Sequence, residues 1–250
     1  DPCVWARVND NGGGDLRRWV EDGCPAVAAG PLTAVQRGLS ELRSVGLSRP
    51  PTSLERNTVV LGDYATVVRG IATGDNSFFL LTKAEARRLA LPDEWLVPAI
   101  ARTRDVVGDC LSQSRMEELD RKGRATLLLC LDGRPVEAFP DPVQRYLAAG
   151  VKRGLPLRPL LSQRKPWYRM ETRRVPPILF AYLGRRNARF VRNVARALPL
   201  TGFLCVYPRS SNPDFLARLW LALEHPATIA NLALVGKSYG SGAIKVEPRA

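Results

Sequence analysis

The sequence is poor in the side chains that usually bind metals or carry acid–base chemistry. Among 250 residues there is one histidine, His225, and the five cysteines are widely spaced without a CxxC pair. This usage argues against a zinc site or a disulfide framework, and it is typical of a reducing compartment. We therefore expect no metal in this chain and a cytoplasmic location. His225 stands alone before a proline, so we assign it no function.

Long apolar runs are also missing. No apolar stretch approaches the roughly 20 residues that a membrane-spanning helix needs, so we expect no membrane partner. Hydrophobic residues nevertheless make up 45% of the chain, enough for one large core or two modest ones. The chain begins with Asp1 rather than methionine, and we expect it to be part of a longer protein.

Acidic residues are nearly absent from residues 143–210. This window of 68 residues holds fifteen Lys and Arg, only two of them Lys, against Glu171 alone. The whole chain carries +13, so the rest of it is close to neutral. Such a block repels itself unless it is spread over a surface or faces a polyanion. Aromatic residues are interleaved with the cations, and arginine forks fit phosphate and guanine acceptors, so the predicted partner is a nucleic acid.

Hydrophobic periodicity and turn residues predict a mixed α/β fold. Residues 1–56 show one helical pattern, at residues 32–45, and are interpreted as a partly helical lead-in or linker. Residues 57–250 are interpreted as a β-rich domain with flanking helices. Strands are expected at residues 59–61, 65–68, 78–81, 125–131, 178–183, 188–193 and 204–207, and helices at residues 82–89, 92–100, 141–150, 212–223 and 226–234.

The loop at residues 70–76, GIATGDN, has two interpretations. Its Gly, Asp and Asn residues supply the turn chemistry of a hairpin. An arginine followed by a glycine-rich loop with exposable amides is also what close approach to a phosphate or a base edge requires. The residues alone leave both interpretations open.

Three segments together resemble a known family. They are RGIATGDNSFFLLT at residues 69–82, KPWYRMETRRVPPILFAYLGRRNARFVRN at residues 165–193, and GKSYGSGAIKVEPRA at residues 236–250. Their order and spacing are similar to the C-terminal target-recognition domain of TaqI-type adenine-specific DNA methyltransferases, which have relatives in restriction–modification and phage defence. The resemblance runs from about residue 61 to the end. It implies a specificity domain that binds duplex DNA beside an N-terminal methyltransferase domain, which binds S-adenosylmethionine and receives a flipped adenine.

The chain departs from the complete enzyme of that family. It has no strand-linked FxGxG-like turn for the cofactor and no NPPY tetrad. The nearest string is NPDF at residues 212–215, where Asp replaces the second Pro and a helix is expected to start. That context favours a capping role. We therefore expect neither S-adenosylmethionine binding nor methylation by this chain alone.

The resemblance and the local chemistry suggest a set of DNA contacts, each with a structural alternative. The loop residues either donate to DNA or form a turn, and Trp167 is either core or a stacking platform. Arg173 and Arg174 are interpreted as phosphate ligands and Arg189 as a base reader. The full set is Arg69, Gly70, Thr73, Gly74, Asn76, Lys165, Trp167, Tyr168, Arg173, Arg174, Arg185, Arg186, Arg189, Lys237, Ser238 and Tyr239.

Two alternatives come from other functional classes. A stand-alone RNA- or DNA-binding protein would share the arginine and aromatic content, although the usual RNA-recognition signatures are missing. A small basic nuclease would need clustered carboxylates or histidines for its metal, and the basic window has one Glu.

Overall fold

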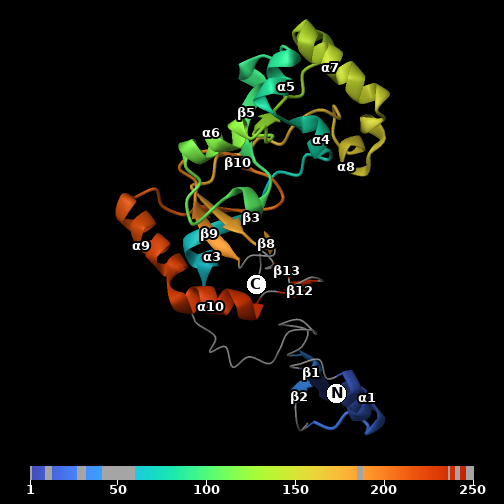
Figure 1. Ribbon diagram of the computed structural model, residues 1–250, viewed down its shortest axis with the longest axis vertical. Coiled ribbons are helices and arrows are strands. Elements are labelled where there is room, and N and C mark those ends of the chain that lie inside the picture. Colours follow the sequence, from blue (N-terminus) through green and yellow to red (C-terminus); the bar gives the residue numbers. More distant parts are fainter. Residues whose placement is uncertain are drawn as a thin grey trace. The chain divides into compact units, whose positions relative to one another are not determined.

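The computed structural model describes residues 2–8, 13–26, 32–40, 60–184, 188–235, 237–239 and 243–245. Internal contacts divide the chain into two compact units, Asp1–Thr58 and Val59–Ala250, each described by itself below. Helices and small sheets are mixed along the chain, so the predicted α/β class is confirmed (Figure 1).

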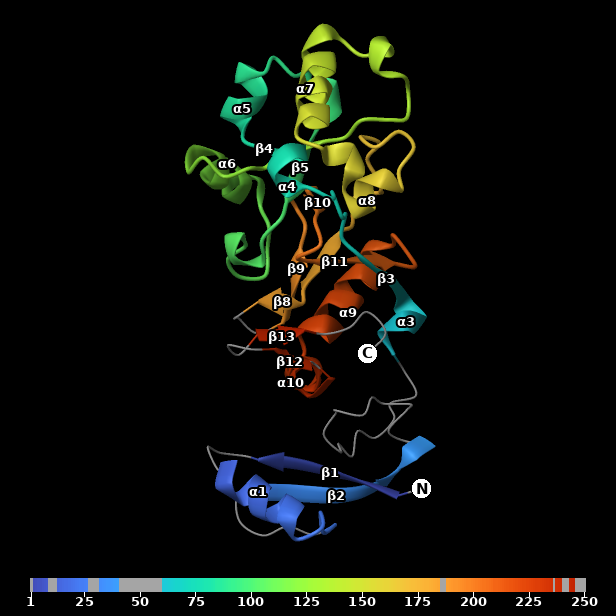
Figure 2. The same cartoon turned by 90° about the vertical axis from the view of Figure 1, so that its right-hand side faces the viewer.

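The first unit contains a two-stranded antiparallel sheet and a helix (Figure 2). β1 (Pro2–Val8) pairs with β2 (Leu32–Gly38) through seven residue pairs, and α1 (Gly13–Glu21) lies between them in the chain. The predicted helix at residues 32–45 is therefore wrong over its first seven residues. Pairing with a distant strand outweighs local periodicity here. Residues 41–45 lie outside the described part of the chain.

The described part of the second unit contains three small sheets. Their strand orders are β10-β5-β6-β4, β3-β11-β7-β9 and β12-β13-β8, and only the pairing of β10 with β5 is parallel. The strands are β3 (Ala65–Arg69), β4 (Leu80–Leu81), β5 (Leu96–Ile100), β6 (Leu127–Leu129), β7 (Ile178–Ala181), β8 (Leu183–Gly184), β9 (Arg189–Arg192), β10 (Leu198–Pro199), β11 (Leu204–Pro208), β12 (Lys237–Tyr239) and β13 (Ala243–Lys245).

Two helices of this unit start at caps that the sequence predicts. Thr82 and Glu85 form a reciprocal capping box, and the Asn212 side chain accepts from two backbone amides, both as predicted. The helices are α3 (Leu61–Tyr64), α4 (Asn76–Phe79), α5 (Lys83–Arg88), α6 (Gln113–Arg121), α7 (Asp141–Lys152), α8 (Pro159–Ser162), α9 (Pro213–Glu224) and α10 (Pro226–Val235). Shorter 3-10 turns are η1 (Asp93–Trp95), η2 (Thr103–Asp105), η3 (Val136–Ala138) and η4 (Leu155–Leu157).

The predicted helix at residues 92–100 is wrong. Residues 93–95 form η1, and residues 96–100 form β5, which pairs with β6. Pro98 lacks a backbone N–H and would interrupt a helix. The strand tolerates it because β10 reaches only Ala99 and Ile100, so Pro98 faces no partner on that side.

The strands predicted at residues 78–81 and 59–61 are also largely wrong. Asp75 Oδ1 accepts a hydrogen bond of 2.8 Å from the Ser77 amide and starts the short helix α4, which leaves only β4 as strand. Of the strand predicted at residues 59–61, residue 59 lies outside the described part of the chain, and Leu61 begins α3 rather than ending a strand.

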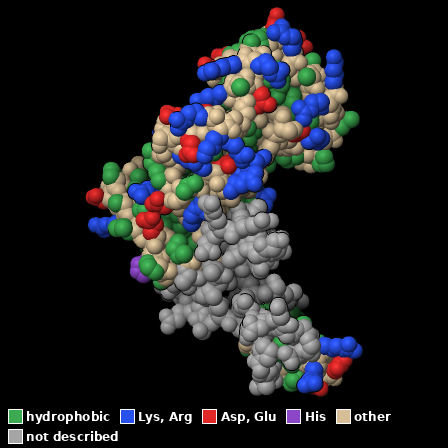
Figure 3. Space-filling view, in the orientation of Figure 1, with side chains coloured by type: hydrophobic (Ala, Val, Ile, Leu, Met, Phe, Trp, Pro, Cys, Tyr) green, Lys and Arg blue, Asp and Glu red, His purple; other side chains and the backbone are tan. Residues whose placement is uncertain are grey.

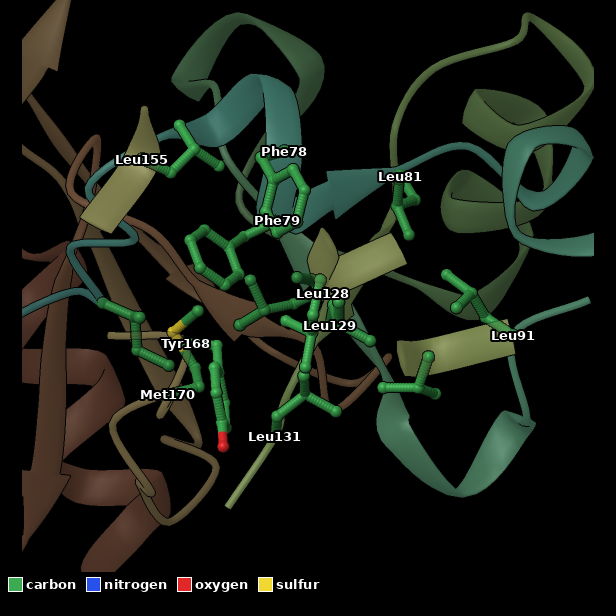
Figure 4. Packing of buried hydrophobic residues seen from close by; sticks show 14 of the residues in the cluster. Phe78, Phe79, Leu81, Leu91, Leu128, Leu129, Leu131, Leu155, Tyr168 and Met170 are labelled. Carbon is green, nitrogen blue, oxygen red and sulfur yellow. The ribbon is translucent and has the colours of Figure 1, made fainter. Parts of the chain in front are cut away.

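The largest buried cluster lies under the sheet β10-β5-β6-β4 and takes in α4 and α7. Phe78 and Phe79 of α4 belong to this cluster together with Leu128, Leu129 and Leu131 of the β6 region, and all five are buried (Figure 4). This cluster anchors the residue 70–76 loop, because that loop enters α4 directly.

The sheet β3-β11-β7-β9 is covered on both faces. Phe180 and Phe190 face Trp220 of α9, which Figure 1 shows beside this sheet. Leu179 and Val191 are the strand neighbours of Phe180 and Phe190, so their side chains point to the opposite face of the sheet. There they belong to a third cluster that includes residues of α6. Among the described residues, no helix has the length and apolar character that crossing a membrane requires.

Candidate nucleic-acid interface

The loop from Gly70 to Asn76 joins two sheets rather than closing a hairpin, because β3 pairs with β11 and β4 pairs with β6. A Cβ atom at Gly70 would lie 2.2 Å from the carbonyl oxygen of Leu200. At Gly74, φ is +87° and a Cβ atom would lie 2.6 Å from Leu161 Cδ2. Both glycines are therefore required by contacts within the chain.

The polar groups of this loop also have internal partners. Thr73 is buried, and its Oγ1 donates to Asn76 Oδ1 at 2.6 Å. The Arg164 guanidinium donates to the carbonyl oxygens of Ala72 and Thr73 at 2.5 and 3.1 Å. Burial lowers the pKa of Arg164. Arg164, from the basic window of residues 143–210, thus holds the backbone carbonyls of the loop in place.

A buried carboxylate, Asp75, uses two further arginines. Its Oδ2 lies 2.6 Å from Arg158 Nη1 and 3.5 Å from Arg153 Nη2. Burial raises the pKa of Asp75, but hydrogen bonds from Ser77 and the charges of Arg158 and Arg153 outweigh it, so the net pKa is lowered. These two cations therefore neutralise a charge of the protein itself.

Arg173 and Arg174, the predicted phosphate ligands, have different surroundings. Arg173 donates to the carbonyl oxygen of Arg69 and to the Glu171 carboxylate, and its side chain is 19% exposed. Arg174 is exposed, and its guanidinium lies 5.3 Å from the ring centroid of Tyr207. No hydrogen bond or ion pair of its side chain is found among the described residues. Arg174 is therefore the more available of the two.

Arg189, the predicted base reader, is held by a loop of the same chain. Its Nε donates to Gly108 O at 3.0 Å, and its Nη2 donates to Val106 O at 2.8 Å. Arg192, at the other end of β9, pairs with Asp109 at 2.9 Å. Both arginines of β9 therefore have partners within the chain, and Arg189 is not held free as a base reader would be.

The two aromatic candidates pack in the large cluster. The Trp167 ring centroid lies 5.7 Å from that of Phe78 and 6.2 Å from that of Phe79. Tyr168 is 3% exposed, and its hydroxyl donates to Arg134 O at 2.7 Å. The structure thus gives both rings a packing role: Tyr168 is buried and offers no face to a base, and Trp167 is partly buried against the cluster.

Three predicted contacts remain exposed, and no side-chain hydrogen bond or ion pair is found for them within the described ranges: Arg69, Lys165 and Arg174. Lys and Arg are the most frequent charged groups on the face of the second unit in Figure 3. Arg185 and Arg186 lie outside the described residues, and Lys237, Ser238 and Tyr239 form β12, whose side chains are likewise not described.

Sequence reasoning missed a polar hollow beside Arg174. Thr66, Arg209, Ser210 and Ser211 line it, and its volume is about 630 Å³. The signal available in the sequence was PRSSNP at residues 208–213, a turn-forming string between a strand and a capped helix.

The comparisons with known proteins point to a single family. Residues 52–250 match the family model described as the C-terminal domain of the Type II methyltransferase M.Eco57I. The chain belongs to this family. It is 27% identical over 198 residues to the Type II methyltransferase M.AccI of Acinetobacter calcoaceticus, covering 77% of this chain and 35% of that protein. The resemblance stated from the three segments, to the C-terminal specificity domain of a DNA methyltransferase, is confirmed.

A solved structure, that of the type IIG restriction endonuclease BpuSI, aligns with all of this chain and 32% of its own. Its identity is 14% and its TM-score 0.41, too low to support a structural argument. This chain therefore spans about a third of the length of the relatives that it matches.

The string nearest to the catalytic tetrad of the methyltransferases lies at residues 212–215. The string at residues 212–215 starts α9, and the Asn212 side chain accepts from the Asp214 and Phe215 amides at 2.8 and 3.3 Å. Asn212 is thereby committed to capping. No group of three or more His, Cys, Asp or Glu suited to a metal occurs among the described residues.

Proposed function

We propose that this chain is the target-recognition domain of a site-specific, adenine-specific DNA methyltransferase that flips its target base. The observation that carries the proposal is the match of residues 52–250 to the C-terminal domain of a Type II methyltransferase. The cation surplus of residues 143–210 supports it, since duplex DNA is the polyanion that such an enzyme must hold.

In this proposal the chain holds the DNA duplex and sets its position relative to the catalytic domain. A base inside a stacked duplex cannot reach a methyl donor, so the enzyme must extrude it while other contacts hold both strands. Exposed cations such as Arg69, Lys165 and Arg174 contact phosphates, and further side chains read base edges in a groove. Arg164 and Arg173 act indirectly, because Arg164 holds the loop that follows Arg69 and Arg173 holds the carbonyl of Arg69 itself.

S-adenosylmethionine and the catalytic residues belong, in this proposal, to a methyltransferase domain that precedes the chain. The string nearest to the catalytic tetrad, at residues 212–215, is used as a helix cap in this chain, which supports placing the catalytic residues in that other domain. The reaction takes place in the cytoplasm, as part of restriction–modification or phage defence. The chain supplies the choice of site, and its partner domain supplies the chemistry.

The proposal is tested by selecting binding sites from a pool of random duplexes with the wild-type chain. A target-recognition domain enriches one short sequence, because each wrong base pair costs about 1–3 kcal/mol. Structured RNA at equal nucleotide concentration serves as the competitor. Enrichment of a site that RNA fails to displace supports the proposal. Equal recovery of all duplexes, or displacement by RNA, contradicts it and favours a stand-alone nucleic-acid-binding protein.

A further inference from the structure

The polar hollow that the sequence did not predict lies where β11 ends and α9 begins. It is lined by Thr66, Arg174, Pro177, Tyr207, Pro208, Arg209, Ser210, Ser211 and Leu216. Its volume of about 630 Å³ falls within the usual range of small-ligand sites, about 300–1,000 Å³. The residues come from four separate segments, so the hollow is a product of the fold.

Two arginines in this hollow are positioned by contacts that leave most of their donors available. Arg174 stacks over Tyr207, and the Tyr207 hydroxyl donates to Arg174 O at 2.7 Å. Arg209 Nη2 donates to Gly62 O at 2.7 Å, and the Arg209 amide donates to Tyr64 O at 2.8 Å. A guanidinium has five N–H donors, so each arginine retains several. Neither pairs with a carboxylate among the described residues.

Hydroxyl groups complete the set of donors. Ser210 Oγ accepts from the Asn212 amide at 3.1 Å, which leaves its own proton for a ligand. The Thr66 and Ser211 side chains are exposed, and no hydrogen-bond partner is found for them within the described ranges. The arginine and hydroxyl side chains that line the hollow can therefore all donate hydrogen bonds to a ligand bound there.

Negative charge is missing from the described lining. Asp214 lies in the first turn of α9 but does not line the hollow, and Asp63 accepts from the Val60 amide elsewhere. The first amides of α9 are taken by the Asn212 side chain. The preference for an anion therefore rests on the arginines and hydroxyls, not on the helix end.

We propose that this hollow is a phosphate-binding site that holds one phosphate of the DNA backbone. The inference rests on the proposed function, because DNA is the source of the phosphate. Arg174 and Arg209 donate to its oxygens together with the serine hydroxyls, and Pro177 and Leu216 contact the adjoining sugar. Such a contact sets the register of the domain on the duplex.

The test uses the selected DNA site in a series of duplexes, each with one phosphate replaced by a neutral methylphosphonate. At one or more positions the replacement should weaken binding of the wild-type chain about tenfold, because one charge-assisted hydrogen bond is lost. In Arg209→Gln the same replacement at the contacted position has no further effect, which is the signature of coupling in a double-mutant cycle. Arg218→Gln, an exposed arginine of α9 that does not line the hollow, leaves every position as in wild type.

A second variant guards against misfolding, since Arg209 also holds Gly62. Ser211→Glu removes no described contact but places a carboxylate in the hollow, and it weakens duplex binding at least as much as Arg209→Gln. Unfolding curves should show that both variants keep the wild-type stability to within about 1 kcal/mol. If Ser211→Glu binds DNA like wild type, the hollow is not the phosphate site.

The possible outcomes separate the two proposals. If the wild-type chain selects a site but no methylphosphonate position couples to Arg209→Gln, the phosphate site is refuted and the proposed function stands. If the wild-type chain binds no duplex, both the phosphate site and the proposed function are refuted. A parallel titration with inorganic phosphate distinguishes the source: binding that Ser211→Glu abolishes, without any duplex binding, identifies free phosphate as the ligand and overturns the DNA assignment.

Discussion

Gly70→Ala tests whether the glycine-rich loop is shaped by packing or by DNA. The added Cβ atom would lie 2.2 Å from Leu200 O, 2.7 Å from Leu200 C and 2.8 Å from Pro199 O. All three are backbone atoms, so no side-chain rotation relieves the contact, and the two segments must move apart. Two hydrogen bonds span this contact, from the Gly70 amide to Phe203 O and from the Ile71 amide to Pro199 O, both 2.9 Å.

The expected loss of stability follows from these contacts. Overpacking costs about 1–3 kcal/mol and each of the two weakened hydrogen bonds about 0.5–1.5 kcal/mol, so the free energy of unfolding falls by about 2–6 kcal/mol. In a domain of about 200 residues this lowers the melting temperature by about 4–24 °C. Thermal and urea unfolding followed by circular dichroism measure the change.

The matched control is Gly62→Ala in α3. Its added Cβ atom has only Val60 Cγ2 within 4 Å, at 3.9 Å, and its φ is not positive. Stability should stay unchanged or rise by up to about 1 kcal/mol, because alanine is the better helix former. If Gly70→Ala keeps wild-type stability but loses DNA affinity, the packing explanation is refuted and the glycine serves approach of DNA.

Two further predictions concern charge. Duplex affinity of the wild-type chain should fall at least tenfold between about 50 and 200 mM salt. The double variant Lys165→Gln, Arg174→Gln should reduce the salt slope by about 1.8, whereas the control Arg87→Gln, Arg121→Gln, which removes two cations that are also exposed, should leave it unchanged. If both double variants changed the slope equally, specific phosphate contacts would be contradicted. Because the folded-state pKa of Asp75 is lowered, its contribution to stability is present above its unfolded pKa of about 4 and is lost as the pH falls through the lower folded value. Asp75→Asn should therefore destabilise the protein at pH 7 and less so near pH 3 in urea unfolding, and an equal effect at both pH values would exclude the ion pairs as the cause.

Elements set by local chemistry could be predicted from the sequence, and elements set by distant pairing could not. The caps at Thr82 and Asn212 are local, and they begin α5 and α9 as expected. β7 and β11 are short apolar runs, and their length and flanking residues are enough to predict a strand. β2 and β5 depend on β1 and β6, which lie far away in the chain, so their local patterns suggested helices.

The candidate site shows a different limit of sequence reasoning. The charge of residues 143–210 predicted a polyanion partner, but it could not show which arginines the protein uses itself. Arg164 and Arg173 donate to loop carbonyls 91 and 104 residues away, and a long guanidinium side chain leaves no local pattern for such a contact. Arg209 was missed for the converse reason, because its neighbours indicate only a turn.

The most direct test of the central claim is the ratio of two dissociation constants for the wild-type chain at one fixed salt concentration. One is for the site selected from the random pool, and the other is for a scrambled duplex of the same composition. A target-recognition domain should prefer the selected site by about 10³ or more, since readout of base edges adds to the uniform contribution of phosphates. A ratio near one would mean that the basic surface binds nucleic acid without reading it, and the assignment of target recognition to this chain would be wrong.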